Sequence, residues 1–387
     1  MKILINATNL AEAGARSVAM NFLGSCPTAE GRDDLVVYAP PARGFEALAG
    51  PGTVVRTLPR SLRGPLRRYL ASGGWWRQVI REERPDVVFN MGNCALPVPM
   101  TQVTLFHWPH AIYPDTEVWR RMRTRDWVRR KLRYVLFRRR LPFTTVMIAQ
   151  TETAARRLRR YYGIPEVYVV PNAVSLQKAS EHVGRLAILR EGNSRIRLLC
   201  FTRYYYHKNL EILLPVAKRL KEVSAPFQIV LTLGRNQHAN VGRMLRDIRR
   251  WGLEDYIHNI GPVEMRDVPA LYASVDALLL PTLLESFSQT YVEAMHFGKP
   301  IFTSDRDFAH DVCGPAAFYF DPNDAGSIVR TLTEAYETGE AIAHRVEQGK
   351  RRAAAMPDWH TVGAMFLCIL RRVAEEHGPS RQEKPTE

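Results

Sequence analysis

Short apolar runs alternate with longer amphipathic stretches along most of this chain. The runs are apolar at consecutive positions, which is typical of parallel strands covered by helices on both faces. Seven runs lie in the first half, at residues 3–6, 35–39, 54–57, 87–90, 101–106, 145–149 and 167–170. Six lie in the second half, at residues 197–201, 228–232, 257–260, 277–280, 300–303 and 317–320. This order predicts an α/β protein with two Rossmann-like domains in tandem.

The stretches between the runs have helical periodicity. In the first half they cover residues 15–23, 73–84, 117–137 and 152–162. In the second half they cover residues 210–223, 241–251, 268–273, 290–297, 325–337 and, after Pro357, 359–376. The predicted organisation is therefore an N-terminal domain (1–172), a polar linker (173–194), a C-terminal domain (195–356), a helix (357–378) and a polar tail (379–387), which we expect to be disordered.

Composition narrows the class of protein. A chain of 387 residues suits two domains. Its five cysteines are far apart and form no CxxC pair, so we expect neither a disulfide framework nor a zinc site, and a reducing cytosol fits. The opening MKILINATNL predicts a first strand rather than a signal peptide. Apolar stretches of membrane-spanning length are absent from the sequence, so we expect a cytoplasmic protein that is at most peripheral on a membrane.

Positive charge is concentrated in the first half. The formal net charge is +15, and residues 1–172 hold 27 basic against 13 acidic side chains, whereas the remainder holds 27 against 26. The densest cluster runs from Trp119 to Leu141, with 11 basic residues and one acid, Asp126. This asymmetry predicts a polyanionic partner for the first half: nucleic acid, an anionic membrane surface or a phosphorylated substrate.

The sequence PTLLESFSQTYVEAMHFGKP places two glutamates eight residues apart after a predicted strand. Glu285 follows the strand, where it can reach a sugar, and Glu293 lies on the next helix, where a carboxylate can accept two ribose hydroxyls. Ser286, Phe287 and Ser288 lead into that helix, whose free N–H groups can hold a diphosphate. The alternative is that both glutamates are solvated surface residues.

A second strand, loop and helix carries two cations. In CFTRYYYHKN, Arg203 and Lys208 follow the strand at residues 197–201. Arginine gives forked hydrogen bonds to phosphate and lysine a point charge, so the pair can neutralise a diphosphate leaving group. In a chain this rich in arginine, a basic turn without function is the alternative.

The sequence TLFHWPH places His107 at the end of a strand and His110 three residues later. A neutral imidazole at His107 can hydrogen-bond a sugar hydroxyl or carry a proton, whereas we expect His110 to pack beside Trp108. The pair lacks the further ligands of a metal site.

In the segment after the first strand, Gly14 begins a helix and lets a ligand approach the backbone. The pattern there is not G-x-G-x-x-G, so a nicotinamide site is not supported.

Together these segments resemble the retaining glycosyltransferases of family 4, which have the GT-B fold. The resemblance covers most of the chain and is strongest from Arg197 to Asp321. It implies two Rossmann-like domains facing a cleft, with the helix that contains Trp359 crossing back to the N-terminal domain. The variant LLESFSQTYVEAM looks like the bacterial O-antigen and exopolysaccharide mannosyl- or rhamnosyltransferases. The chain departs from the family at Asn209, where glycine is usual.

The resemblance also implies residue roles. Glu293 would bind the nucleotide ribose. Arg203 and Lys208 would hold the diphosphate and stabilise its developing charge, without a metal ion, and Gly14 matches the glycine loop beside the diphosphate. The donor sugar would be positioned by Glu285, by the backbone at residues 286–288 and by His107.

The predicted function is therefore transfer of a hexose from a nucleotide-diphosphate sugar to a glycan or polyprenyl-diphosphate-linked acceptor in cell-surface polysaccharide synthesis. No cofactor is implied, and GDP-mannose is among the candidate donors. One hypothesis is that the segment from Trp119 to Leu141 docks the enzyme on the anionic inner face of the plasma membrane. The alternative is that its apolar side packs on the core of the domain and its charges are only solvated. Two alternatives stay open: a sugar-nucleotide epimerase of the same fold, and a basic nucleic-acid-binding protein without catalysis.

Overall fold

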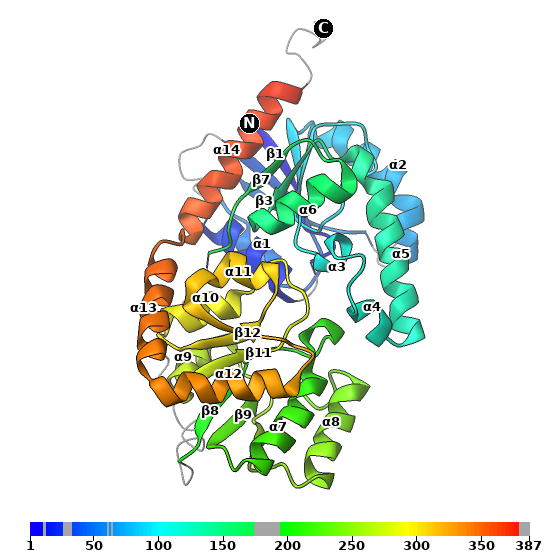
Figure 1. The fold of residues 1–387 in the computed structure, drawn as a ribbon. Coiled ribbons are helices and arrows are strands. Elements are labelled where there is room, and N and C mark those ends of the chain that lie inside the picture. Colours follow the sequence, from blue (N-terminus) through cyan, green and yellow to red (C-terminus); the bar gives the residue numbers. More distant parts are fainter. Residues whose placement is uncertain (11–12, 26–32, 60–61, 63–64, 174–193, 379–387) are drawn as a thin grey trace, which may run out of the picture. The chain divides into compact units, whose positions relative to one another are not determined.

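The computed structural model describes the chain except residues 11–12, 26–32, 60–61, 63–64, 174–193 and 379–387 (Figure 1). The described chain forms two compact units. The N-terminal unit contains Met1–Ile112, Arg123–Ala173 and the C-terminal segment from Pro357 onward. The C-terminal unit contains Tyr113–Met122 and Val174–Met356. The predicted linker lies outside the described residues except at its ends, and the predicted tail lies wholly outside them.

The N-terminal unit is built on a seven-stranded parallel sheet of order β3-β2-β1-β4-β5-β6-β7. Its strands are β1 (Lys2–Asn6), β2 (Asp34–Ala39), β3 (Thr53–Thr57), β4 (Val87–Asn90), β5 (Gln102–Leu105), β6 (Val146–Ala149) and β7 (Val167–Val169). Its helices are α1 (Ala13–Ser25), α2 (Pro65–Glu83), α3 (Pro109–Ile112), α5 (Thr124–Arg140), α6 (Glu152–Tyr162) and α14 (Trp359–His377).

Side chains of β1 alternate between two hydrophobic cores, as the period of a strand requires. Ile3 and Ile5 face the core shared with α1 and α14, whereas Leu4 faces the core shared with α2. In the first core, α14 packs beside α1 (Figure 1). The rings of Phe22 (α1) and Phe366 (α14) meet edge to face there, with 5.4 Å between their centroids. The C-terminal helix is therefore part of the N-terminal unit, as predicted.

The C-terminal unit is built on a six-stranded parallel sheet of order β10-β9-β8-β11-β12-β13. Its strands are β8 (Ile196–Cys200), β9 (Phe227–Leu231), β10 (Ile257–Asn259), β11 (Ala277–Leu280), β12 (Ile301–Ser304) and β13 (Ala317–Phe320). Its helices are α4 (Val118–Arg121), α7 (Leu213–Glu222), α8 (Ala239–Arg250), α9 (Val268–Ala273), α10 (Gln289–His296), α11 (Asp307–Cys313), α12 (Ala325–Thr338) and α13 (Glu340–Ala354).

The single helix predicted at residues 117–137 is wrong. The chain is extended at Met122 and Arg123, which separates α4 from α5. The two pieces pack in different units: Trp119 is buried in the core of the C-terminal unit, whereas Phe137 of α5 is buried in the N-terminal unit. The extended residues Met122 and Arg123 let each helix pack in the core of its own unit.

The segment Tyr113–Met122 is tied to the C-terminal unit by polar contacts as well. The Tyr113 hydroxyl donates to Asp307 Oδ1 at 2.7 Å, and Arg306 forms an ion pair with Glu117 at 3.1 Å. Within residues 1–172, which were predicted as one domain, this ten-residue segment therefore belongs to the C-terminal unit.

Helix α13 was not predicted. Its apolar positions, Ile342, Val346 and Ala353, are spaced as a helix requires, so the signal was present in the sequence. Gly349 is buried against α10, where a Cβ atom would lie 3.2 Å from Met295 Cγ. Glycine therefore allows the two helices to approach closely.

None of the described helices is long and apolar enough to cross a bilayer alone; α13 and α14 meet that criterion only as a pair bent by 51°.

Candidate active site

The C-terminal unit has a topological switch point between β8 and β11. From β8 the next strand in sequence, β9, lies on one side, and β11 lies on the other. Ligands of open α/β sheets bind at the carboxyl ends of the strands at such a point. The loop after β8 carries Arg203 and Lys208, and the loop after β11 carries Glu285. The structure therefore brings the two most informative sequence motifs to the same edge of one sheet.

Lys208 and Glu285 form an ion pair across these loops. Their side chains are only 13% and 10% exposed, so the pair is largely shielded from solvent. The Thr282 hydroxyl lies 3.2 Å from Glu285 Oε1, and the Leu283 N–H donates to the His207 carbonyl at 2.7 Å. The backbone and side-chain bonds together hold the Lys208 ammonium and its partner carboxylate at the carboxyl edge of the sheet.

Asn209 shapes the loop that presents Lys208. It has a left-handed backbone (φ 54°), which asparagine tolerates better than most residues and which glycine adopts without strain. Its side chain is buried: Nδ2 donates to the Pro322 carbonyl at 2.7 Å, and Oδ1 accepts from Arg121. Arg121 also donates to Asn323 Oδ1 at 2.6 Å. Sequence reasoning missed Arg121, because only the fold brings α4 to this loop.

Glu293 lies on α10 and is buried. The Tyr272 hydroxyl lies 3.3 Å from Glu293 Oε2 and donates to it. Burial raises the pKa of Glu293 to about 7, and the Tyr272 bond offsets only part of that effect. A carboxyl group in this state gains from ligand hydroxyls, because each hydrogen bond to its ionised form lowers the energy of that form.

Helix α10 begins after Ser288, whose side chain makes no capping hydrogen bond. The Tyr291 N–H donates to the Ser288 carbonyl at 3.1 Å. The N–H groups of Gln289 and Thr290 precede the first intrahelical bonds and can donate to an anion. Ser286 and Ser288 are buried and Phe287 is half-buried, so the loop itself is packed. The predicted loop and helix junction is present at the end of β11.

Arg203 stands apart from this group. It lies on the loop after β8, its side chain is exposed, and it forms no ion pair with any of the described residues. The structure does not bring its guanidinium into contact with Lys208 or Glu285. Its exposure leaves the side chain able to turn towards a bound anion.

His107 follows β5 in the N-terminal unit. Its backbone N–H donates to Asn93 Oδ1 at 2.7 Å, and this bond fixes the loop after β5. Burial, with a smaller contribution from the positive charge of Arg133, lowers the pKa of His107 to about 3. The imidazole is therefore neutral at physiological pH. His110 is buried and stacks beside Trp108, the packing role expected for it.

Gly14 is the second residue of α1 and is exposed. A Cβ atom added there would meet no atom of the described residues within 4 Å, so these residues leave space beside Gly14. The switch point of this sheet lies between β1 and β4, whose last residues Asn6 and Asn90 share a side-chain hydrogen bond of 2.9 Å. Sequence reasoning missed Asn6 and Asn90, although each is an asparagine that ends an apolar run.

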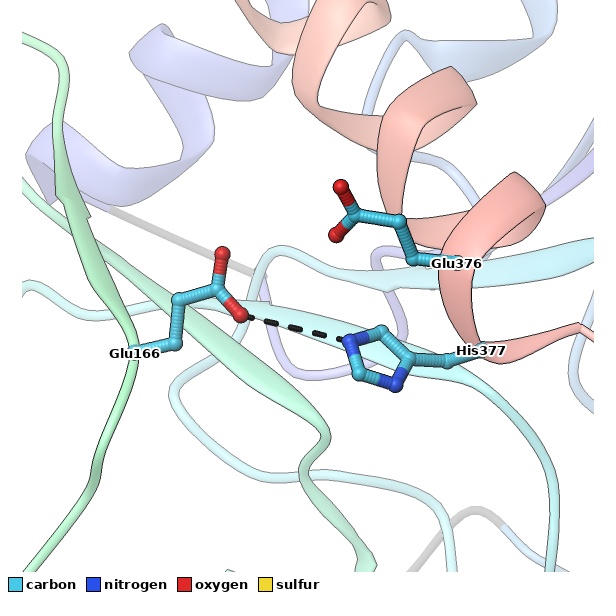
Figure 2. Close-up of side chains that lie close together, drawn as sticks. All are labelled: Glu166, Glu376 and His377. Carbon is cyan, nitrogen blue, oxygen red and sulfur yellow. Dashed lines mark ion pairs between the residues drawn. The ribbon is translucent and has the colours of Figure 1, made fainter.

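One group of potential metal ligands exists among the described residues: Glu166, Glu376 and His377 (Figure 2). Their ligating atoms lie within 4.8 Å of one another, and His377 forms a 4.0 Å ion pair with Glu166. The Tyr168 hydroxyl donates to Glu166, and Arg372 pairs with Glu376 at 2.8 Å. The group lies beside the amino end of β7, away from the edge that carries His107, and its carboxylates already have protein partners.

Comparison with known proteins gives the family. Residues 28–178 match the model of Glycosyltransferase Family 4, and residues 187–352 match that of Glycosyl transferases group 1. The chain is a family 4 glycosyltransferase. The two matches fall on the two halves that carry His107 and the Lys208–Glu285 pair, respectively.

Two curated relatives of this glycosyltransferase are mannosyltransferases. It is 25% identical to the MMP alpha-(1->4)-mannosyltransferase of Mycolicibacterium hassiacum over 314 residues, 76% of this chain and 73% of the relative. It is 26% identical to the O-antigen chain mannosyltransferase RfbU of Salmonella typhimurium over 138 residues, 35% of this chain and 37% of the relative.

A solved structure shares the fold of the glycosyltransferase. Anabaena Alr3699/HepE, in complex with UDP and glucose, superposes with a TM-score of 0.70 and 18% identity, covering 96% of this chain and 99% of HepE. The predicted GT-B fold is therefore confirmed.

Proposed function

We propose that this enzyme is a retaining hexosyltransferase that takes its sugar from a nucleotide-diphosphate donor and passes it to a glycan or lipid-linked acceptor in cell-surface polysaccharide synthesis. The observation that carries the proposal is the cluster at the switch point of the C-terminal unit. There the Lys208–Glu285 pair, the open start of α10 and the buried Glu293 follow β8 and β11.

The charges of this cluster suit a nucleoside diphosphate. Lys208 and the N–H groups of α10 favour the diphosphate, and Arg203 is exposed and able to add a forked contact. Glu293 would accept hydrogen bonds from the two ribose hydroxyls, which would replace the solvation that burial removes. Because protein groups supply the positive charge, the proposed reaction needs no divalent metal ion.

In the proposed reaction the bond between the anomeric carbon and the diphosphate oxygen breaks. The electron pair goes to the diphosphate, where Lys208 and Arg203 stabilise the charge. The acceptor hydroxyl oxygen bonds to the anomeric carbon on the face that the diphosphate leaves, and its proton passes to a diphosphate oxygen. Glu285 and residues 286–288 would position the sugar, and Gly14 would lie by the diphosphate. His107, neutral because its pKa is about 3, would offer the sugar a hydrogen bond.

Two mannosyltransferase relatives make GDP-mannose the first donor to test. Purified enzyme is incubated with isotope-labelled GDP-mannose, and with other nucleotide hexoses in parallel, on a lipid extract containing acceptors. We expect a labelled glycan whose anomeric configuration, read by NMR, matches that of the donor, with and without EDTA. If the enzyme neither hydrolyses nor transfers any of the nucleotide sugars, the proposal is overturned. An inverted product would overturn retention alone, and loss of activity in EDTA would overturn metal independence alone.

A further inference from the structure

Helix α5 presents its apolar side chains to solvent. Trp127, Val128, Leu132 and Val135 are 41%, 52%, 58% and 44% exposed. Their spacing (i, i+1, i+5, i+8) places them on one side of a helix with 3.6 residues per turn. We call these four residues the α5 apolar face.

The inward side of α5 is the more polar one. Phe137 is its buried apolar residue, in contact with Phe106 and Trp108. Arg133 stacks over the Trp108 ring at 4.7 Å, and the Arg130 guanidinium lies 3.4 Å from His110 Nδ1. An ordinary surface helix turns its apolar stripe inward, so α5 is reversed. Folding of the described chain leaves the apolar face uncovered.

Positive charge surrounds the α5 apolar face. The helix carries eight basic residues and one acid, Asp126. Arg125, Arg129 and Arg138 are exposed, and each lies three or seven residues from a member of the apolar face, which puts it next to that face on the helix surface. Aromatic and aliphatic side chains bordered by arginine and lysine are typical of helices that lie in the headgroup region of a bilayer.

We propose that α5 docks the enzyme on an anionic lipid bilayer, with the α5 apolar face inserted at the headgroup boundary and Arg125, Arg129 and Arg138 on the lipid phosphates. This inference rests on the proposed function, because it places the enzyme where a lipid-linked acceptor would be found. It also narrows the sequence prediction: Trp119 and Met122, at the start of the predicted segment, are buried in the core of the C-terminal unit and take no part.

The test is co-sedimentation of the full-length protein with vesicles, without any sugar nucleotide, so that its outcome is independent of transferase activity. One set of vesicles is phosphatidylcholine, and the other is an equal mixture of phosphatidylcholine and phosphatidylglycerol. The charge variant is Arg125→Glu/Arg129→Glu/Arg138→Glu, and its control reverses exposed arginines of α8, Arg243→Glu/Arg246→Glu/Arg250→Glu. The apolar variant is Trp127→Ser/Leu132→Ser, and its control is the equally exposed pair Trp251→Ser/Val223→Ser.

We expect the wild type and both controls to bind the anionic vesicles and to bind the neutral ones weakly. The charge variant should lose at least about 100-fold in partitioning, since each of the three cations contributes about a factor of five and the introduced glutamates are repelled by the lipid phosphates. The apolar variant should lose about tenfold or more on the same vesicles. Equal binding to both kinds of vesicle, or equal losses in the controls, would overturn the proposal. Binding to random-sequence RNA in place of vesicles, lost in the charge variant, would assign the surface to nucleic acid instead.

Discussion

The Lys208 ammonium and the Glu285 carboxylate are paired between the loops that follow β8 and β11, the two strands that flank the switch point of the C-terminal sheet. Neither residue is near the other in sequence. The two side chains meet because parallel strands place their carboxyl ends on the same edge of the sheet. The pair holds the Lys208 ammonium at the edge of the sheet where we propose that the diphosphate binds, and Glu285 balances its charge.

Lys208→Ala should lower the rate of sugar transfer about 100- to 1000-fold, the usual effect of removing one group that stabilises developing negative charge. The measurement is single-turnover transfer at saturating donor. Lys221→Ala removes an exposed lysine of α7 and serves as the control. A Lys208→Ala rate within about threefold of the wild type would show that Lys208 does not face the leaving group.

Arg121→Ala should weaken the same site without touching substrate. Arg121 holds the Asn209 and Asn323 side chains together, so its loss should loosen the loop that carries Lys208. We expect faster amide exchange at residues 206–211 and about a tenfold lower rate of transfer. Arg121→Lys should not restore either, because a lysine cannot bond both amide oxygens in a fixed fork.

The neighbour Arg120 is the control for this prediction, since it is exposed and belongs to the same short helix. Arg120→Ala should leave both readouts unchanged. Slower transfer in Arg121→Ala with amide exchange of residues 206–211 unaltered would contradict a positioning role.

Glu293 should make stability depend on pH. Its pKa is raised from 4.5 to about 7 in the folded protein, so between these values the folded state binds a proton that the unfolded state does not. Its contribution to the free energy of unfolding is therefore present below pH 4.5 and is lost as pH rises through 7. In urea unfolding, the free energy of unfolding of Glu293→Gln relative to that of the wild type should rise by up to about 3 kcal/mol from pH 5 to pH 8. A constant difference between the two proteins across this range would contradict the raised pKa.

Phe366→Ala should destabilise the N-terminal unit by about 3–5 kcal/mol, because it empties a fully buried position between α1 and β4. The measurement is amide exchange of β1 and β4, which reports this unit separately. Cys368→Ala, at an exposed position of the same helix, is the control. Unchanged protection of β1 in Phe366→Ala would mean that α14 contributes little to this core.

The strands and most helices could be predicted because apolar runs and helical periodicity are local signals. The positions of Lys208, Glu285 and Glu293 followed from them, because strand ends in parallel sheets share an edge. The break at Met122 could not be predicted, since the periodicity from α4 into α5 is continuous and only tertiary packing divides it. The role of Arg121 was equally hidden, because its partners Asn209 and Asn323 are distant in sequence. Membrane docking by the segment from Trp119 to Leu141 was predicted, but a periodic stripe does not say which side faces the core, so the sequence did not identify the exposed residues of α5.

The central claim is that the switch point of the C-terminal unit binds a nucleoside diphosphate, and titration calorimetry tests it most directly. GDP, UDP, ADP and dTDP are titrated into the wild type, Lys208→Ala, Glu293→Ala and the surface control Glu264→Ala. The account predicts that at least one of them binds the wild type and the control equally well, and binds both site variants about 10- to 100-fold more weakly. Failure of all four to bind the wild type, or equal affinity in all four proteins, would contradict it.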